Sequence, residues 1–222
     1  MDAATDSCNV DCQENDEVRL CTAVKIPDWL LKRDLERQEA VERRKEEKDS
    51  QAVTEEKGDF FSSTFNAEKV LTMGAEIQQR DVLLTHLSNC KVRLFGSPST
   101  LHIKHTQNSE ILCGPVSSSV FVDHVSGCTL AFPCQQLRTH NTTDTQVYLH
   151  VTSRAIVEDC SSVRFAPFSW SYPGIDADFE VSGLDKDRNN WTLVDDFNWL
   201  AANTPSPNWT IIPESERRSN WD

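Results

Sequence analysis

The segment CQQLRTH, residues 134–140, places three large polar side chains in a stretch that otherwise has the pattern of buried strand. These are Gln135, Gln136 and Arg138, and the arginine is either an ordinary surface charge or is aimed at a partner. Glu158 follows Arg138 by twenty residues. If that interval is one coil of a repeating structure, the carboxylate holds the guanidinium in one orientation. A surface ion pair of this kind stabilises a fold by only about 0–1 kcal/mol.

Motifs for other chemistry are absent from the sequence. It has no GxxxxGK[ST] or GxGxxG nucleotide loop, no GxSxG elbow and no HExxH motif. His102 and His105 come nearest to a metal pattern. On a strand, residues three apart point to opposite faces, so these two imidazoles cannot converge easily. We therefore expect no metal and no bound cofactor.

Short apolar segments recur every 16 to 20 residues. The structure that they form must position the polar side chains of the CQQLRTH segment. One set comprises LHIKH from 101, VFVDHV from 120, QLRTH from 136 and AIVED from 155. A second set, between them, comprises CKVRLFG from 90, EILCG from 110, CTLAFP from 128, TQVYLH from 145 and SVRFAPF from 162. Short strands at a fixed period predict a solenoid, here a parallel β-helix, in which each coil stacks on the next. An antiparallel sandwich is the competing interpretation. If Leu137 and Val157 point into the core, Arg138 and Glu158 point outward.

The segments before this repeat differ in character. Residues 1–25 are polar and aperiodic, which predicts disorder. Residues 26–80 are expected to form a helical extension, because good helix formers follow Pro27 and because Val70, Met73 and Ile77 have helical spacing within 66–80. The β-helix domain is then expected to span 81–222.

The segments after the repeat are expected to cap the solenoid from about residue 171. WSYPGIDADF has the composition of a loop, and LVDDFNWLA, from Leu193, has the pattern of a short helix. Trp209 and Trp221 are expected to cover the open end of the solenoid, where strand edges lack partners.

Composition excludes several classes of function. With 22 Lys and Arg against 35 Asp and Glu, the formal net charge of −13 argues against binding driven by nucleic-acid phosphates. No apolar run approaches the length of about 18 residues that a membrane span needs, and the N-terminus lacks the pattern of a signal peptide. We expect a cytoplasmic protein whose thiols stay reduced. Those among apolar segments are predicted to be buried and free: Cys90, Cys113, Cys128, Cys134 and Cys160.

Several longer segments resemble the tubulin-folding cofactor C family, also described as C-CAP/cofactor C-like. They are ILCGPVSSSVF at 111–121, CQQLRTH at 134–140, VTSRAIVEDCSSVRFAPFSWSYP at 151–173, NNWTLVDDFNWL at 189–200 and SPNWTIIP at 206–213. The resemblance is dense from about Gln79 to the end of the sequence. It implies a right-handed parallel β-helix, in agreement with the repeat.

The resemblance also implies a function. The family acts with cofactors D and E on the αβ-tubulin heterodimer and stimulates GTP hydrolysis by β-tubulin, so GTP is bound by the partner. Its catalytic arginine corresponds to Arg138, its GTPase-contacting glutamine to Gln135, with Gln136 beside it, and Glu158 to an acidic residue that pairs with the arginine in a related activator of Arl GTPases. A guanidinium supplied in trans suits this role, because charge spreads over the γ-phosphoryl oxygens in the transition state. The chain itself needs no hydrolytic site.

Two alternatives remain open, and one region departs from the family. The chain is either an activator, for β-tubulin or for an Arl-type GTPase, or a non-catalytic module that binds tubulin or another GTPase. The segment LERQEAVERRKEEKDSQAVTEEKGDFFSSTF resembles the first helix of a spectrin-like N-terminal domain, but most of its second and third helices are missing. Tubulin binding by that region is therefore doubtful. We expect a monomer, associated with the cytoskeleton.

Overall fold

The computed structural model describes residues 61–66, 70–199, 201 and 204–221. By internal contacts the chain divides into two units, Met1–Glu56 and Lys57–Asp222, and the described residues all belong to the second. The expected disorder of 1–25 and the helix expected after Pro27 lie outside these residues and stay predictions.

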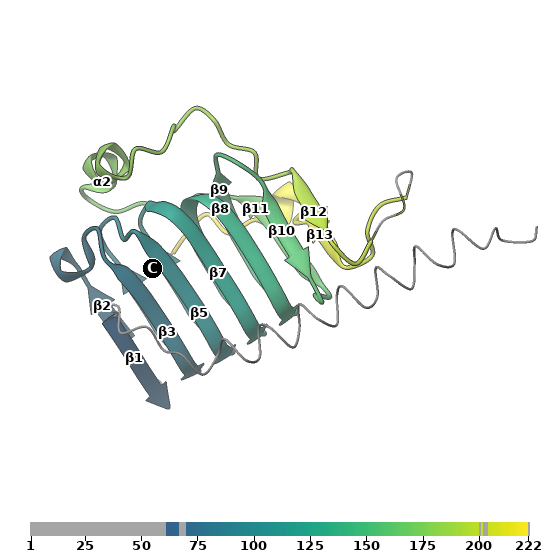
Figure 1. Ribbon diagram of the computed structural model, residues 1–222, viewed down its shortest axis with the longest axis horizontal. Coiled ribbons are helices and arrows are strands. Elements are labelled where there is room, and N and C mark those ends of the chain that lie inside the picture. The colour runs from purple at the N-terminus through teal and green to yellow at the C-terminus, as the bar shows by residue number, and fades with distance from the viewer. Residues whose placement is uncertain (1–60, 67–69, 200, 202–203, 222) are drawn as a thin grey trace, which may run out of the picture. The chain divides into compact units, whose positions relative to one another are not determined.

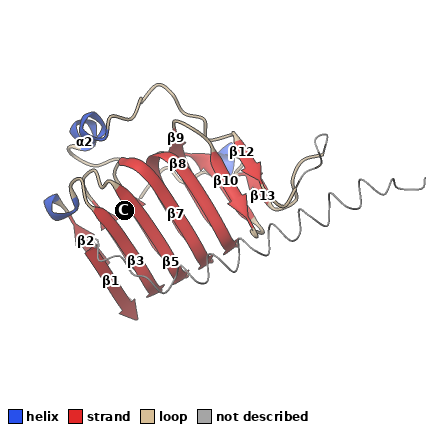
Figure 2. Cartoon of the chain, in the orientation of Figure 1, coloured by secondary structure: helices blue, strands red, loops and turns tan. Residues whose placement is uncertain are grey.

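Parallel strands alternate between two faces of one stack (Figures 1 and 2). We call the first the open face; its strands are β1 (Phe61–Asn66), β3 (Asp81–Ser88), β5 (Thr100–Gln107), β7 (Val116–Ser126), the second half of β8 (Thr129–Thr143), β10 (Ala155–Glu158) and β12 (Val194–Asp196). The second is the covered face; its strands are β2 (Val70–Met73), β4 (Lys91–Leu94), β6 (Glu110–Cys113), the first half of β8, β9 (Gln146–Val151), β11 (Val163–Pro167) and β13 (Trp209–Ile211). This is a parallel β-helix, as predicted, and the antiparallel sandwich is excluded.

The register shows how each coil stacks on the next. Leu101 pairs with Val120, nineteen residues on, and Leu137 pairs with Ala155, eighteen residues on. The predicted period of 16 to 20 residues is therefore confirmed at these steps. These four side chains continue the buried row that begins at Val82, and each has an exposed fraction of 0%. Because one coil is too small to bury its apolar side chains alone, the stacked rows together form the core.

The five predicted thiols lie inside this fold, and all are buried and outside any disulfide: Cys90, Cys113, Cys128, Cys134 and Cys160. Burial raises the pKa of Cys128 to about 11, although its sulfur accepts a hydrogen bond from the Ser109 N–H and donates one to the Ser126 carbonyl oxygen. This thiol therefore stays protonated at neutral pH and packs as a small apolar group.

The predicted helix over residues 66–80 is wrong. That segment contains β2 and a short 3₁₀ turn, Ala75–Ile77, and the first coil of the solenoid already includes β1. The β-helix therefore begins before residue 81. The spacing of Met73 and Ile77 suits a helix, but the same two side chains are 4% and 0% exposed in the solenoid core. Tertiary burial, rather than helical periodicity, explains their apolar character.

Two expectations for the C-terminal segment are also corrected. Of WSYPGIDADF, expected to form a loop, residues 175–179 belong to the helix α2 (Ile175–Ser182), and LVDDFNWLA contains β12 rather than a helix. β12 pairs with β10 and β13 with β11, so each face gains one more strand; a further 3₁₀ turn spans Glu214–Glu216. The helix prediction is wrong at β12 because pairing with a strand of the neighbouring coil satisfies the hydrogen bonds of its backbone. Among the described residues no helix has the length and apolar character to cross a membrane.

The C-terminal segment covers one face of the solenoid. On that face an outward row of four residues, which we call the covered row, is paired in register and fully buried: Leu112, Ala131, Tyr148 and Ala166. The side chains that bury it come from the segments after β11 and after β13: Trp170, Tyr172, Ile212 and Trp221. Trp221 therefore lies over the covered face and not at the open end, whereas Trp209 belongs to the final strand and packs edge-on against Phe165, 6.0 Å between centroids.

Glycine is required beneath this cover. A Cβ at Gly114 would overlap the hydroxyl of Tyr172 and the carbonyl oxygen of Gly96. The Tyr172 hydroxyl donates a 2.6 Å hydrogen bond to Asp178 on α2. Only a residue without a side chain lets this tyrosine approach the backbone so closely.

Candidate functional site

The CQQLRTH segment lies where β8 passes from the covered face to the open face. Cys134 pairs with Val151 of β9 on the covered face, and Leu137 pairs with Ala155 of β10 on the open face. Between these points the register with β7 shifts by one residue, so the ladder is interrupted opposite Gln135. Bulges of this kind bend a strand and redirect its side chains. The extra residue lies in β7, and opposite it Gln135 and the next residue of β8 are both exposed.

Arg138 is exposed on the open face, and Leu137 before it is fully buried, as the alternation predicts. Its side chain belongs to an outward row that runs across five strands, which we call the open row: Leu83, His102, Phe121, Arg138 and Ile156. The other four members are partly exposed. Within the described residues the Arg138 guanidinium has no hydrogen bond or ion pair to another side chain.

The expected pairing of Arg138 with Glu158 is not present. Glu158 pairs in register with His140, and the residue beside Arg138 on that strand is Ile156. The coil is eighteen residues long at this step, whereas the pairing assumed twenty. The two side chains share a face but lie two positions apart along it. Their proximity is therefore diagonal, and no ion pair between them occurs in the part of the chain described.

Arg154 offers a contrast on the same face. Its guanidinium makes two hydrogen bonds of 2.6 Å to the carboxylate of Asp195, the geometry of a bidentate ion pair. This arginine is exposed but already has an acceptor for its planar fork. Arg138 has none among the described residues, so its donors remain available to an oxyanion from another molecule.

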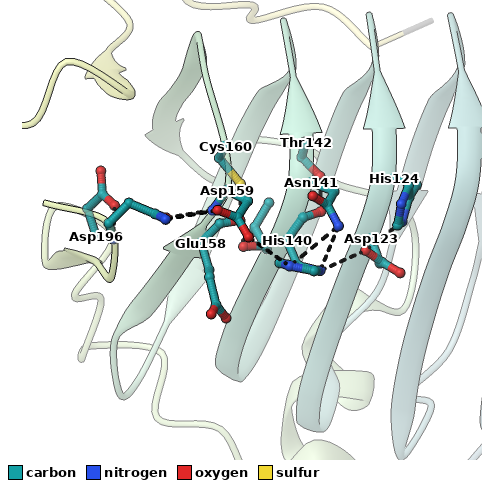
Figure 3. A network of polar contacts seen from close by, with 11 residues as sticks. Asp123, His124, His140, Asn141, Thr142, Glu158, Asp159, Cys160 and Asp196 are labelled. Carbon is teal, nitrogen blue, oxygen red and sulfur yellow. Dashed lines mark hydrogen bonds and ion pairs between the residues drawn. The ribbon is translucent and has the colours of Figure 1, made fainter. Parts of the chain in front are cut away.

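A polar network crosses the open face one row away from Arg138, and Figure 3 shows its members. His140 lies between two carboxylates, with Nδ1 3.1 Å from Asp123 on β7 and Nε2 3.3 Å from Asp159 after β10. Asn198, beyond β12, hydrogen bonds to Asp159 in turn. The network joins successive coils beside the candidate site. The sequence pattern did not lead us to predict this network, although the polar residue after each open-face strand segment could have indicated it.

The two histidines considered for a metal have separate surroundings. His102 lies in the open row against Phe121, with ring centroids 4.9 Å apart. His105 lies within β5, at a position with φ of 49°, and stacks between His86 and His124, with ring centroids 5.0 Å from each. No group of three or more metal-ligating side chains occurs within the described ranges.

The sequence of the chain matches a known family. The family model for tubulin binding cofactor C matches residues 79–197, and that for the tubulin-specific chaperone C N-terminal domain matches 28–81. The chain belongs to the tubulin binding cofactor C family. The matched range includes the whole open face from β5 to β12 and therefore Arg138 with its surroundings.

Individual relatives agree with the assignment. The chain is 54% identical over 173 residues to tubulin-specific chaperone C of Bos taurus and 62% identical over 148 residues to that of Homo sapiens. These matches cover 75% and 67% of this chain but only 50% and 43% of the relatives, so the chain spans half of their length or less. The solved structure of tubulin binding cofactor C from Leishmania major matches with a TM-score of 0.52 at 18% identity, over 73% of this chain and 93% of that one. The structural match shows the shared fold.

Proposed function

We propose that the chain stimulates GTP hydrolysis by a partner GTPase, supplying Arg138 in trans as an arginine finger. The observation that carries this is an exposed arginine on a rigid solenoid face, with no side-chain partner of its own among the described residues. Gln135 and Gln136 are exposed immediately before it and can contact the same partner. Glu158, diagonal to it, adds negative charge nearby and serves to orient the guanidinium once the partner is bound.

The chemistry assigned to Arg138 is electrostatic. Water attacks the γ-phosphorus, the bond to the β–γ bridging oxygen breaks, and phosphate and GDP leave. During this step a planar guanidinium donates directed hydrogen bonds to the oxygens that gain negative charge. Arginine fingers of this kind accelerate hydrolysis about 10³ to 10⁵-fold. A finger mounted on stacked strands arrives oriented, which reduces the entropy lost on reaching the transition state.

The partner we propose is β-tubulin within the αβ-tubulin heterodimer, with cofactors D and E acting beside this chain during heterodimer assembly. Relatives named tubulin-specific chaperone C support this choice. The nucleotide is bound by the partner, and this chain is proposed to hold no cofactor of its own. We propose a monomer in the cytoplasm, associated with the cytoskeleton.

The test is GTP turnover by tubulin in the presence of cofactors D and E. Arg138→Ala should lower the stimulated rate about 10³-fold at saturating concentrations of the chain. Arg138→Lys should fail as well, since an ammonium lacks the planar fork. An unchanged rate for Arg138→Ala would refute the proposal.

Arg154→Ala is the matched control, because it removes an exposed arginine from the same face. Its guanidinium is already paired with Asp195, so tubulin turnover should stay at the parent level. Equal losses for the two variants would point to the general charge of the face and not to a finger.

Two other functions are separated by the same assay. If Arg138→Ala raises the half-saturating concentration and leaves the maximal rate intact, the chain is a binding module without a catalytic role. If the variant affects an Arl-type GTPase and leaves tubulin unaffected, the arginine chemistry holds but the target changes. A parent chain that stimulates neither GTPase contradicts both versions of the activator.

A further inference from the structure

Apolar side chains flank Arg138 on both sides, although no segment among the described residues covers this row. Phe121 of β7 and Ile156 of β10 are its partners in register, and both are partly exposed. The row on one side is polar, with Lys104, Asp123 and then His140 and Glu158. On the other side lie polar residues as well: Asp81, Thr100, Ser119 and Gln136. Between Leu83 and Ile156 the open row is thus a largely apolar strip, with His102 and Arg138 as its polar members, and Asp195 of β12 lies in register beyond Ile156.

The strip continues away from Arg138 through His102. Its ring packs on Phe121 with centroids 4.9 Å apart. Partial burial lowers the pKa of His102, and the positive charge of Lys104 lowers it further. The neutral imidazole is therefore favoured at neutral pH, and the row keeps its apolar character next to Phe121.

This geometry restricts the path of the arginine side chain. Neighbouring strands lie about 4.8 Å apart, so Phe121 and Ile156 stand directly beside the methylene groups of Arg138. Arginine stems pack along apolar surface while the charged head stays in water. Sideways orientations bring the guanidinium over an aromatic or aliphatic side chain, and among the described residues no carboxylate is hydrogen bonded to it there. The remaining orientation points away from the sheet.

We propose that Phe121 and Ile156 are positioning residues that hold the Arg138 side chain upright and exclude water from its stem once a partner covers the face. The inference rests on the proposed function and names the residues on which its efficiency depends. Neither side chain touches the nucleotide; both act through Arg138. Holding a catalytic group in its reactive orientation matters because a displacement of about 1 Å can cost up to about 100-fold in rate.

The experiment uses the full chain in the tubulin turnover assay with cofactors D and E. Phe121→Ala should lower the maximal stimulated rate about 10-fold, with the half-saturating concentration of the chain changed less than about 2-fold. Phe121→Leu, which keeps an apolar wall, should restore most of the rate. Ile156→Ala should show the same pattern, and it supplies an independent test if Phe121→Ala does not fold.

A double-mutant cycle separates positioning from independent contact. In the Arg138→Ala background, Phe121→Ala should have no further effect, because the residue it positions is gone. Leu83→Ala is the control at the far end of the same strip, three strands from Arg138, and should leave the maximal rate unchanged.

Three outcomes would overturn the inference. The first is a higher half-saturating concentration for Phe121→Ala with an unchanged maximal rate, which would make the residue a docking contact. The second is additivity of Phe121→Ala with Arg138→Ala, and the third is an equal loss for Leu83→Ala. Failure of the proposed function is distinct from all three: it appears as an unchanged rate for Arg138→Ala alone.

Discussion

The two faces of this solenoid are both made of parallel strands, but they differ in how far their outward rows are buried. Each carries an outward row that includes large apolar side chains. On the covered face Tyr148 is 1% exposed, with Trp221 edge-on against it at 4.7 Å between centroids. On the open face Phe121 and Ile156 remain partly exposed beside an arginine. The chain's own C-terminal segment buries one row and leaves the other accessible.

This difference assigns separate tasks to the two faces. Burial of the covered row stabilises the fold, because apolar area is removed from water at about 25 cal/mol per Å². The open row contributes little of this kind, and under the proposed function it is the surface that another molecule contacts. Substitutions should therefore affect stability on one face and partner activity on the other.

Trp221→Ala should have the largest effect on stability. The indole packs on Tyr148, and its N–H donates a 3.1 Å hydrogen bond to Ser169 Oγ. Loss of a buried tryptophan costs about 3–5 kcal/mol. For a domain of this size the midpoint of thermal unfolding should fall by roughly 10 °C. A shift as small as that of a surface variant would show that the C-terminal cover is dispensable.

Glu110→Gln should have an intermediate effect that depends on pH. Glu110 accepts hydrogen bonds from Arg93, at 2.5 Å, and from Arg218, which joins the C-terminal segment to β6. Burial disfavours the charge, but these two arginines outweigh it and hold the pKa of Glu110 below its ordinary value of 4.5. Charged hydrogen bonds of this kind contribute about 2 kcal/mol.

The sign of the pH effect follows from that direction. Because the folded-state pKa is below the unfolded one, the stabilisation by Glu110 is complete above pH 4.5 and is lost as pH falls through the lower folded value. Denaturant unfolding of parent and Glu110→Gln should therefore differ at neutral pH and converge in acid. A constant difference across this range would contradict the role of the charge.

Lys104→Ala on the open face should have the smallest effect. Lys104 lies in register between Thr85 and Asp123, and within the described ranges its ammonium has no ion pair. Its removal should change the free energy of unfolding by less than about 0.5 kcal/mol. A loss comparable to that of Trp221→Ala would mean that the open face also supports the fold, and the comparison between the faces would fail.

The sequence alone predicted the solenoid, the buried thiols and the outward direction of Arg138. Strand alternation with period two and stacking at a nearly constant interval are local properties, so a single chain displays them without knowledge of contacts. The CQQLR segment also stood out because polar residues interrupt a buried pattern. These features required no long-range information.

Only the tertiary structure decided which residues stand side by side. One coil of eighteen residues instead of twenty moved Glu158 to His140 and left Phe121 and Ile156 beside Arg138. Coil length varies because turns absorb extra residues at little cost, and no local pattern reports that variation. Likewise, strand β2 and strand β12 resembled helices in their spacing, yet pairing with distant strands set their conformation. The sequence determined the architecture and the exposure of the arginine, whereas the register between coils determined which residues lie beside that arginine.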